Sequence, residues 1–158
     1  MLKKYIIVFL ISMVPLIELR GAVPYAVALG LPLWQSMVIA VVGNMIPVPF
    51  IFLFARKVLE WGKDKKVIGG FFRWCLEKGD KARVKLESKA GRGLYIALLL
   101  FVGIPLPGTG AWTGTLAARF LNMDVKKSVL YVLLGVLLAG VIMLIASLGV
   151  VGAISLAK

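Results

Sequence analysis

The sequence predicts an all-α integral membrane protein with two inverted repeats, each a re-entrant helical hairpin plus a transmembrane helix, joined by a basic cytoplasmic loop. The first observation is composition, since 61% of the 158 residues are hydrophobic and 16% are charged, against about 45–50% and 25% in soluble domains. The second is that 21–55, 93–118 and 128–157 contain no Asp, Glu, Lys or Arg, and each exceeds the roughly 18 apolar residues that indicate a membrane span. The third is a similar order of elements in the two halves, which indicates an internal duplication.

The net charge of +12 is concentrated between the two halves. Twelve of the 19 Lys and Arg residues lie from Arg56 to Arg92. Cytoplasmic loops of membrane proteins carry such an excess, and anionic lipid headgroups are sufficient partners for it, so nucleic acid is not expected as a partner. Aromatic residues among the basic ones at 67–90 predict an amphipathic helix at the membrane interface. We therefore expect a single membrane domain, 1–158, composed of repeat 1 (1–55), the basic loop (56–92) and repeat 2 (93–158).

Two apolar stretches are too short to cross a bilayer. Residues 5–17 would reach roughly 20 Å as a helix, whereas the hydrocarbon core is roughly 30 Å thick, and 94–102 are shorter still. Each is interpreted as one arm of a re-entrant hairpin, with 21–32 and 111–121 as the returning arms. The alternative is that 5–19 cross as a short span from a cytoplasmic N-terminus.

Each hairpin is followed by a segment long enough to span the bilayer, 33–55 in the first half and 128–157 in the second. Arg56 and Lys57 place the end of the first span in the cytoplasm, and Lys126 places the start of the second span there. The two hairpins would then enter from opposite sides, and their tips would meet near the middle of the membrane.

The two halves also align weakly, residue by residue. After a shift of 89 positions and a three-residue insertion, Ser36 falls on Ser128 and Gly43 on Gly135. The alignment supports the prediction of an inverted repeat, a frequent feature of transporters.

The segment GIPLPGTGAWTG, residues 103–114, is the least helical part of an otherwise apolar run. Pro105 and Pro107 lack N–H groups and cannot continue a helix, while Gly108 and Gly110 allow positive φ or close backbone approach. Such backbone is tolerated at membrane depth only where it is buried in protein or lines a polar cavity. The free N–H groups of the next half-helix point a positive end inward, which attracts anions. We therefore predict a substrate or ion site here that includes Thr109, Trp112 and Thr113.

Glu18 is the only acid in the first 59 residues, and it lies at the predicted tip of the first hairpin. Burial disfavours the charged form of a carboxyl group, so Glu18 is expected either to exchange a proton or to be held in an ion pair with Arg20 or Arg119. Arg20 is expected to bind a phosphate or carboxylate bidentately or to be a structural partner. Arg119 is expected to snorkel to headgroups or to select substrate at the inner gate.

The segment GNMIPVP, residues 43–49, interrupts the first span. Pro47 and Pro49 would leave two carbonyls free, and Asn44 adds an amide, so the cluster suits an ammonium, a sodium ion or a hydronium. The alternative is a kink in which Asn44 bonds to a neighbouring helix. Pro24, in ELRGAVP after the first tip, is included in the candidate site.

Several classes of site are excluded. The chain contains no His and one Cys, Cys75, which excludes a His-ligated metal, a Cys–His nucleophile and an intrachain disulfide. It contains no nucleophile–base pair and no Walker A sequence. We therefore expect no enzyme activity, no metal and no cofactor.

At ELRGAVP, GN followed by PVP, and PLPGTGAWTG, the chain resembles the putative small multidrug export protein family over nearly its whole length, and more distantly the DedA/VTT superfamily. The resemblance implies two re-entrant hairpins face to face, and either movement of lipids such as undecaprenyl phosphate or proton-dependent transport. It implies that Glu18 is the acid of the first hairpin and that 105–110 form the proline–glycine tip. The arginine-rich motif of the DedA second hairpin is represented only by Arg119.

Three functions are open at this point. The first is a proton- or ion-coupled secondary transporter of small cationic or amphipathic molecules in the plasma membrane. The alternatives are a DedA/VTT-like lipid flippase or scramblase, with Arg20 and Arg119 on the headgroup phosphate, and a membrane structural factor that transports nothing. Four membrane elements are too few to enclose a path, so besides membrane lipid we expect a homodimer or larger assembly, held by small-residue faces at Gly135, Gly140, Gly149 and Gly152.

Overall fold

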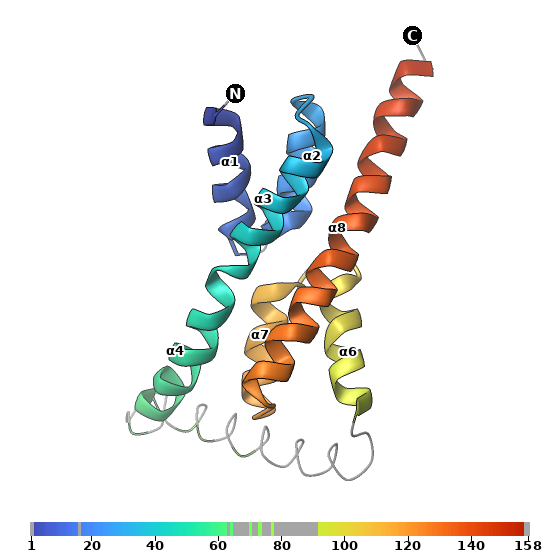
Figure 1. Cartoon of the computed structure of the whole chain (residues 1–158). Helices are drawn as coiled ribbons and strands as arrows, with labels where there is room; N and C mark the ends of the chain where they lie inside the picture. Colours follow the sequence, from blue (N-terminus) through green and yellow to red (C-terminus); the bar gives the residue numbers. More distant parts are fainter. Residues whose placement is uncertain are drawn as a thin grey trace.

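The computed structural model of the chain (Figure 1) describes residues 2–15, 17–62, 64, 70, 73, 77 and 92–156. The described residues form helices and contain no strand. The helices are α1 (Leu2–Met13), α2 (Glu18–Ala28), α3 (Leu33–Met45), α4 (Pro47–Gly62), α6 (Arg92–Gly103), α7 (Ala111–Phe120) and α8 (Val125–Leu156). Apart from 70, 73 and 77, the amphipathic helix expected at 67–90 lies outside the described residues.

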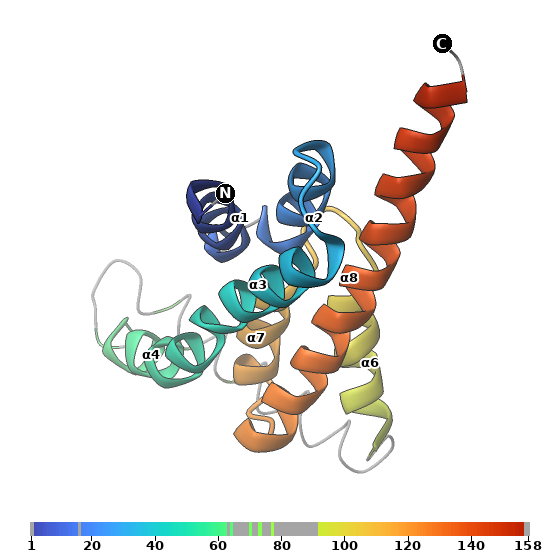
Figure 2. The same ribbon diagram turned by 45° about the horizontal axis from the view of Figure 1, so that its top comes forward.

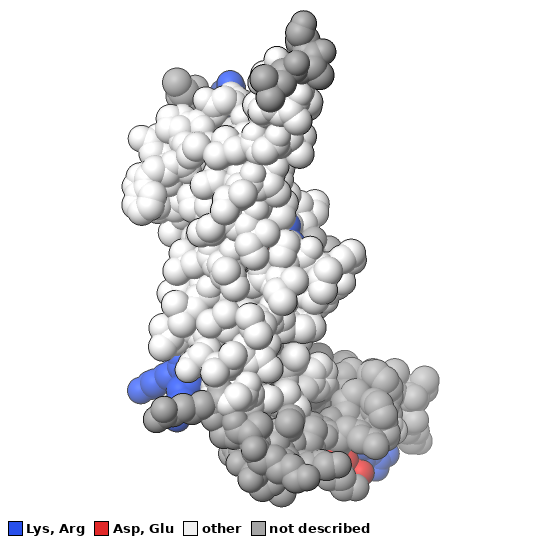
Figure 3. Space-filling model, turned by 90° about the vertical axis from the view of Figure 1, so that its right-hand side faces the viewer, with Lys and Arg blue, Asp and Glu red and all other residues white. Residues whose placement is uncertain are grey.

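Two helical stretches are long and apolar enough to cross a membrane. They are Leu33–Ala55, with 23 residues and a mean hydropathy of 2.3, and Val125–Ser155, with 31 residues and a mean hydropathy of 2.9. They coincide with the segments predicted to span, 33–55 and 128–157. On the face shown in Figure 3, the charged side chains of the described residues gather at the two ends of the molecule, and the band between them is almost wholly uncharged.

The first of these stretches is interrupted where the sequence predicts. Helix α3 ends at Met45 and α4 begins at Pro47, because a proline lacks the N–H that would continue α3 but fits the first position of a new helix. The start of α4 is anchored in the core, since Val48 and Phe52 are buried.

The short helices form two pairs at opposite ends of the molecule. In Figure 1 the α1–α2 pair occupies the upper half and the α6–α7 pair the lower half, while the turns of both pairs lie near the middle. Figure 2 shows the same separation from another direction. Helix α2 packs on α3 and α8, and α7 packs on α8 and α4, so each pair contacts the long helices of both halves.

Helices α2 and α7 end in the same way. Gly30, with φ +65°, follows α2, and the next amide donates a hydrogen bond of 3.1 Å to the carbonyl of Ala26. Asn122, with φ +53°, follows α7, and the next amide donates a hydrogen bond of 2.9 Å to the carbonyl of Ala118. A left-handed residue with this bond satisfies carbonyls at a helix C-terminus. The two termini lie 92 positions apart, the separation that also relates the predicted pairs Ser36/Ser128 and Gly43/Gly135.

The paired glycines make equivalent contacts. A Cβ atom on Gly43 would lie 2.8 Å from the carbonyl oxygen of Phe9 in α1, and one on Gly135 would lie 2.7 Å from that of Leu99 in α6. Each long helix therefore approaches the backbone of its own hairpin at a glycine.

One expectation is corrected by the structure. Helix α2 begins at Glu18, so Glu18 and Arg20 belong to its first turn and not to an unwound tip before residue 21. Gly135 and Gly140 pack within the chain, Gly140 against Met37; their role in a homo-oligomer stays a prediction. Glycine in an apolar helix permits close approach in either setting. No described atom lies within 4 Å of a Cβ placed on Gly149 or Gly152.

Candidate functional site

The turn between α6 and α7, residues 104–110, is non-helical as predicted. Gly108 adopts φ +80° and Gly110 adopts φ +136°, and the missing N–H groups of Pro105 and Pro107 leave nearby carbonyls without helical donors. Those carbonyls need other partners, since an unsatisfied backbone group in an apolar environment costs several kcal/mol.

Arg20 supplies those donors from the other helix pair. Its Nη1 donates to the carbonyl oxygens of Leu106 (2.6 Å) and Thr109 (2.7 Å). Its Nη2 donates to the carbonyl oxygens of Val102 (3.3 Å) and Ile104 (3.2 Å) and to Oγ1 of Thr109 (2.7 Å). The planar guanidinium thus binds the whole turn, as its fixed fork of donors allows.

Glu18 binds the same turn at its other end. Its side chain is 3% exposed, and its two carboxylate oxygens accept hydrogen bonds from the backbone N–H groups of Ala111 (3.1 Å, to Oε2) and Trp112 (3.0 Å, to Oε1). These N–H groups belong to the first turn of α7, where the helix has no internal acceptor for them and its dipole favours negative charge. A carboxylate in this position makes charge-assisted bonds.

Local backbone conformation makes this contact possible. Glu18 itself has φ +52°, an uncommon conformation for a residue other than glycine, and such strain persists only where the surrounding structure holds it. A Cβ atom on Gly110 would collide with the Glu18 carboxylate, so only glycine leaves room for it. The order of residues in GTGAW therefore forms a cradle for this side chain.

Two predictions about the charged residues are affected. The carboxylate oxygens of Glu18 accept hydrogen bonds from backbone amides of α7, and the negative charge of Glu18 also attracts the Arg20 guanidinium. The predicted ion pair with Arg20 or Arg119 stays a prediction. Both terminal nitrogens of Arg20 are engaged by the turn, which leaves no free fork for a phosphate in this conformation. Arg20 is a bridge between the two helix pairs.

The other predicted site residues surround this contact or lie apart from it. Thr113 donates a 3.5 Å hydrogen bond to the carbonyl of Gly110, and Pro24 lies half-buried within α2. Asn44 is 2% exposed at the end of α3, and its Oδ1 has no hydrogen-bond partner among the described residues. Arg119 lies in the last turn of α7, away from the turn that binds Arg20.

Sequence reasoning missed the acceptors of the site. The free carbonyls were expected at 43–49, but those bound by a cation are the carbonyls of Val102, Ile104 and Leu106, and the cation is Arg20. Pro105 and Pro107 remove the donors to the carbonyls of Phe101 and Gly103, so the proline spacing predicts the break in the helix but not these acceptors. Thr115, fully buried with its hydroxyl bonded to the carbonyl of Ala111, had no comparable signal.

No group of three or more His, Cys, Asp or Glu side chains that could hold a metal ion occurs among the described residues. The site can instead hold two helix pairs together through one buried acid, Glu18, and one half-buried base, Arg20.

Comparison with known families gives one match. The family model described as "Putative small multi-drug export protein" matches residues 18–142, a segment that begins at Glu18 and includes the turn between α6 and α7. No curated protein and no solved structure matches the chain. With its two apolar helices and this match over most of its length, the chain belongs to the putative small multi-drug export protein family of membrane proteins.

Proposed function

We propose that the protein is a proton- or ion-coupled secondary transporter that exports small cationic or amphipathic molecules across the plasma membrane. The observation that carries the proposal is the contact between the turns of the two helix pairs, in which Glu18 holds the N-terminus of α7. The family description supports an export role. The contact places a buried carboxyl group where the two helix pairs meet.

The proposal includes an inverted repeat with two re-entrant hairpins. Helix α1 has 12 residues and spans about 18 Å, less than the roughly 30 Å of the hydrocarbon core. Helix α7, with 10 residues, is shorter still. The matching helix ends and glycine contacts 92 positions apart support the repeat. The turns would then close the path near the middle of the membrane.

Protonation of Glu18 opens this contact. An ionised carboxylate accepts both N–H bonds, whereas a protonated carboxyl group carries a donor on one oxygen and loses acceptor strength on the other. Protonation therefore weakens the bonds to Ala111 and Trp112 and frees the first turn of α7. A cationic substrate that approaches the carboxylate displaces the proton, which couples export to proton entry.

Arg20 stays bound to the turn between α6 and α7 during the whole transport cycle. Because its guanidinium donates five hydrogen bonds to the α6–α7 turn, its release would cost all five bonds in an apolar environment. The lipid-flippase alternative, which needs Arg20 to bind a phosphate, has less support for that reason. Arg119, outside the bridged turn, is the other basic residue that this alternative would use.

The test uses purified protein in detergent and in proteoliposomes. We expect ethidium or tetraphenylphosphonium to release protons from the wild-type protein, and no release from Glu18→Gln. Asp64→Asn, which removes an exposed carboxylate just after α4, is the matched control and should behave as wild type. In proteoliposomes, an imposed proton gradient should drive accumulation of the same compounds.

Two other outcomes would replace the proposal. Transbilayer movement of a fluorescent phospholipid that is lost in Arg20→Ala would indicate a flippase or scramblase. Inactivity in both assays, together with a membrane-integrity defect in cells that lack the protein, would indicate a structural factor.

We also propose that the protein forms a homodimer, and two glycines of α8 now support it in place of four. Of the four glycines first considered, Gly149 and Gly152 in the C-terminal part of α8 have no described neighbour. Cross-linking in native membranes should therefore join two copies through these positions and not through Gly135 or Gly140.

A further inference from the structure

Buried polar groups that the Glu18 contact does not use lie where α3 ends. The side chains of Asn44 in α3 and Ser12 in α1 are 2% and 0% exposed. Oδ1 of Asn44 has no hydrogen-bond partner among the described residues. A buried polar group without a partner is costly, above all in a membrane, where such groups commonly have a function. The presence of these groups therefore needs an explanation beyond packing.

Three oxygen atoms gather around this end of α3. The hydroxyl of Ser12 lies beside the backbone of Gly43, where it would collide with a Cβ atom. It donates a 2.7 Å hydrogen bond to the carbonyl of Phe9, which uses its proton and leaves lone pairs on the oxygen. Pro47 has no N–H to donate to the carbonyl of Gly43. Together with Oδ1 of Asn44, these are acceptors without a described donor.

The second half of the chain packs in the same way without polar groups. Val102 lies against Gly135 in the place that Ser12 takes in the first half. Val136 stands where the first half has Asn44, at the 92-residue separation found above, and both valines are 1% exposed. Helix α8 continues through this region without a break. The packing therefore requires neither the two polar side chains nor the break at 46–47.

The three oxygens suit a monovalent metal cation. Hydroxyl, amide and carbonyl oxygens are ligands of the kind that hard cations take. They carry no formal charge, so they would not offset the cost of a divalent cation in an apolar environment. The C-terminus of α3 contributes the negative end of its dipole. In secondary transporters, the C-terminal ends of half-helices and free carbonyls coordinate sodium in this way.

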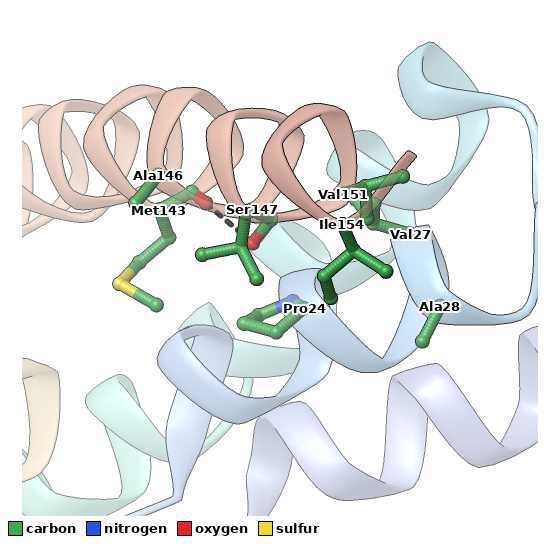
Figure 4. Close-up of a pocket in the computed structure, with 9 residues that line it drawn as sticks. Pro24, Val27, Ala28, Met143, Ala146, Ser147, Val151 and Ile154 are labelled. Atoms are coloured by element: carbon green, nitrogen blue, oxygen red, sulfur yellow. Dashed lines mark hydrogen bonds between the residues drawn. The ribbon is translucent and has the colours of Figure 1, made fainter. Parts of the chain in front are cut away.

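The groove between α2 and the C-terminal part of α8 is less suited to a cation. It measures about 370 Å³, and only one of its lining side chains is polar, that of Ser147 (Figure 4). The hydroxyl of Ser147 donates a 2.6 Å hydrogen bond to the carbonyl of Met143. A cation in the groove would meet mostly hydrocarbon, so the break in the first span is the better site.

We propose that the break between α3 and α4 binds a monovalent metal cation through Oδ1 of Asn44, Oγ of Ser12 and the carbonyl oxygen of Gly43, with water as the remaining ligands. The cation gives the buried amide oxygen of Asn44 a partner. In the transporter it serves as a coupling ion besides the proton of Glu18, and this role rests on the proposed function. Binding itself does not depend on transport.

The first experiment measures binding of radioactive sodium to the full-length protein in detergent by scintillation proximity. We expect saturable binding that unlabelled NaCl displaces and choline chloride of equal ionic strength does not. Asn44→Val, which copies Val136, should weaken binding at least about tenfold, because loss of a group that merely orients a metal ligand already weakens metal binding about 10–100-fold. Ser12→Ala should have the same effect if Asn44→Val fails to fold. Ser128→Ala removes a buried hydroxyl of α8 that has no described partner and should bind as wild type.

Thermal stability gives a second readout. The melting temperature of the wild type should rise by about 3–6 °C when NaCl at about ten times the dissociation constant replaces choline chloride. Asn44→Val should not respond to sodium. It should also melt above the wild type in choline chloride, because it removes a buried group without a partner. A larger rise in KCl than in NaCl would make potassium the cation of the same site.

Three results would overturn the inference. The first is the absence of both displaceable sodium binding and a melting shift in NaCl or KCl. The second is binding that is equal in wild type, Asn44→Val and Ser12→Ala. The third is binding that is lost in Glu18→Gln and intact in Asn44→Val, which would place the cation at Glu18 and not at the break.

The outcome is separable from the proposed function. Cation binding that depends on Asn44, in a protein that releases no protons to substrate cations, would contradict proton coupling and leave the cation site standing. Proton release that depends on Glu18, without cation binding at the break, would contradict the cation site alone.

Discussion

Gly110→Ala is the most informative single change, because it affects the Glu18 contact without altering a charge. The substitution has two separate effects. The first effect is backbone strain: Gly110 adopts φ +136°, a conformation found almost only in glycine, which costs other residues about 1–3 kcal/mol. Its Cβ would also collide with the Glu18 carboxylate, which would have to leave the N–H groups of Ala111 and Trp112.

The magnitude of the second effect follows from the bonds lost. Two hydrogen bonds to a charged group contribute about 1.5–3 kcal/mol each, so displacement of the carboxylate costs about 3–6 kcal/mol beyond the backbone strain. Since about 1.4 kcal/mol is a factor of ten, protection of these amides against hydrogen exchange should fall by at least about a hundredfold. Hydrogen-exchange mass spectrometry of peptides covering 110–113 measures this directly.

Gly108→Ala is the matched control. Gly108 also has positive φ, +80°, but no described atom lies within 4 Å of the place that its Cβ would occupy, so the variant carries the strain without the collision. Glu18→Ala removes the same two bonds, so adding it to Gly110→Ala should lower the protection of these amides little further than either change alone. Equal effects of Gly110→Ala and Gly108→Ala, or a loss in the double variant equal to the sum of the two single losses, would show that the collision with Glu18 is not the cause.

Further predictions concern the bridge and the helix crossings. Arg20→Lys keeps the charge but loses the planar fork. Because the three donors of an ammonium group cannot replace the five hydrogen bonds of the guanidinium, the variant should unfold at clearly lower SDS concentration than wild type, as followed by tryptophan fluorescence. Gly43→Ala and Gly135→Ala each force a Cβ against a backbone carbonyl at less than 3 Å and should destabilise the protein by about 1–3 kcal/mol in the same assay. Gly149→Ala, at an open position, should instead be neutral or stabilise by up to about 1 kcal/mol; destabilisation as large as at Gly135 would contradict the packing described.

The helical framework was predictable from local sequence. The uncharged runs indicate the apolar segments, and the breaks within them at 46–47 and 104–110 are encoded by prolines that cannot donate and glycines that tolerate positive φ. The short length of the hairpin arms follows from the position of those breaks.

The partners across the site were predictable only in part. The sequence places an acid at one turn and free N–H groups at the other, but which oxygen meets which amide depends on packing between residues 93 and 94 positions apart. Glu18 and Arg20 were predicted at the tip of the first hairpin, but α2 already begins at Glu18. From the first turn of α2, the two side chains bind different ends of the turn between α6 and α7. A glycine on α8 has the same appearance in the sequence whether it packs within the chain or against a second copy, so the intrachain contacts of Gly135 and Gly140 were not predicted.

The protonation of Glu18 can be followed at the two amides that it binds. The decisive measurement is the amide NMR spectrum of Ala111 and Trp112 in the full-length protein in lipid nanodiscs, recorded as pH is lowered. We predict that both amide proton resonances move upfield together with one midpoint as the carboxylate takes up a proton, and that neither titrates in Glu18→Gln. If the resonances stay fixed across the range, or titrate equally without the Glu18 carboxylate, then Glu18 is not the titrating group that joins the two helix pairs.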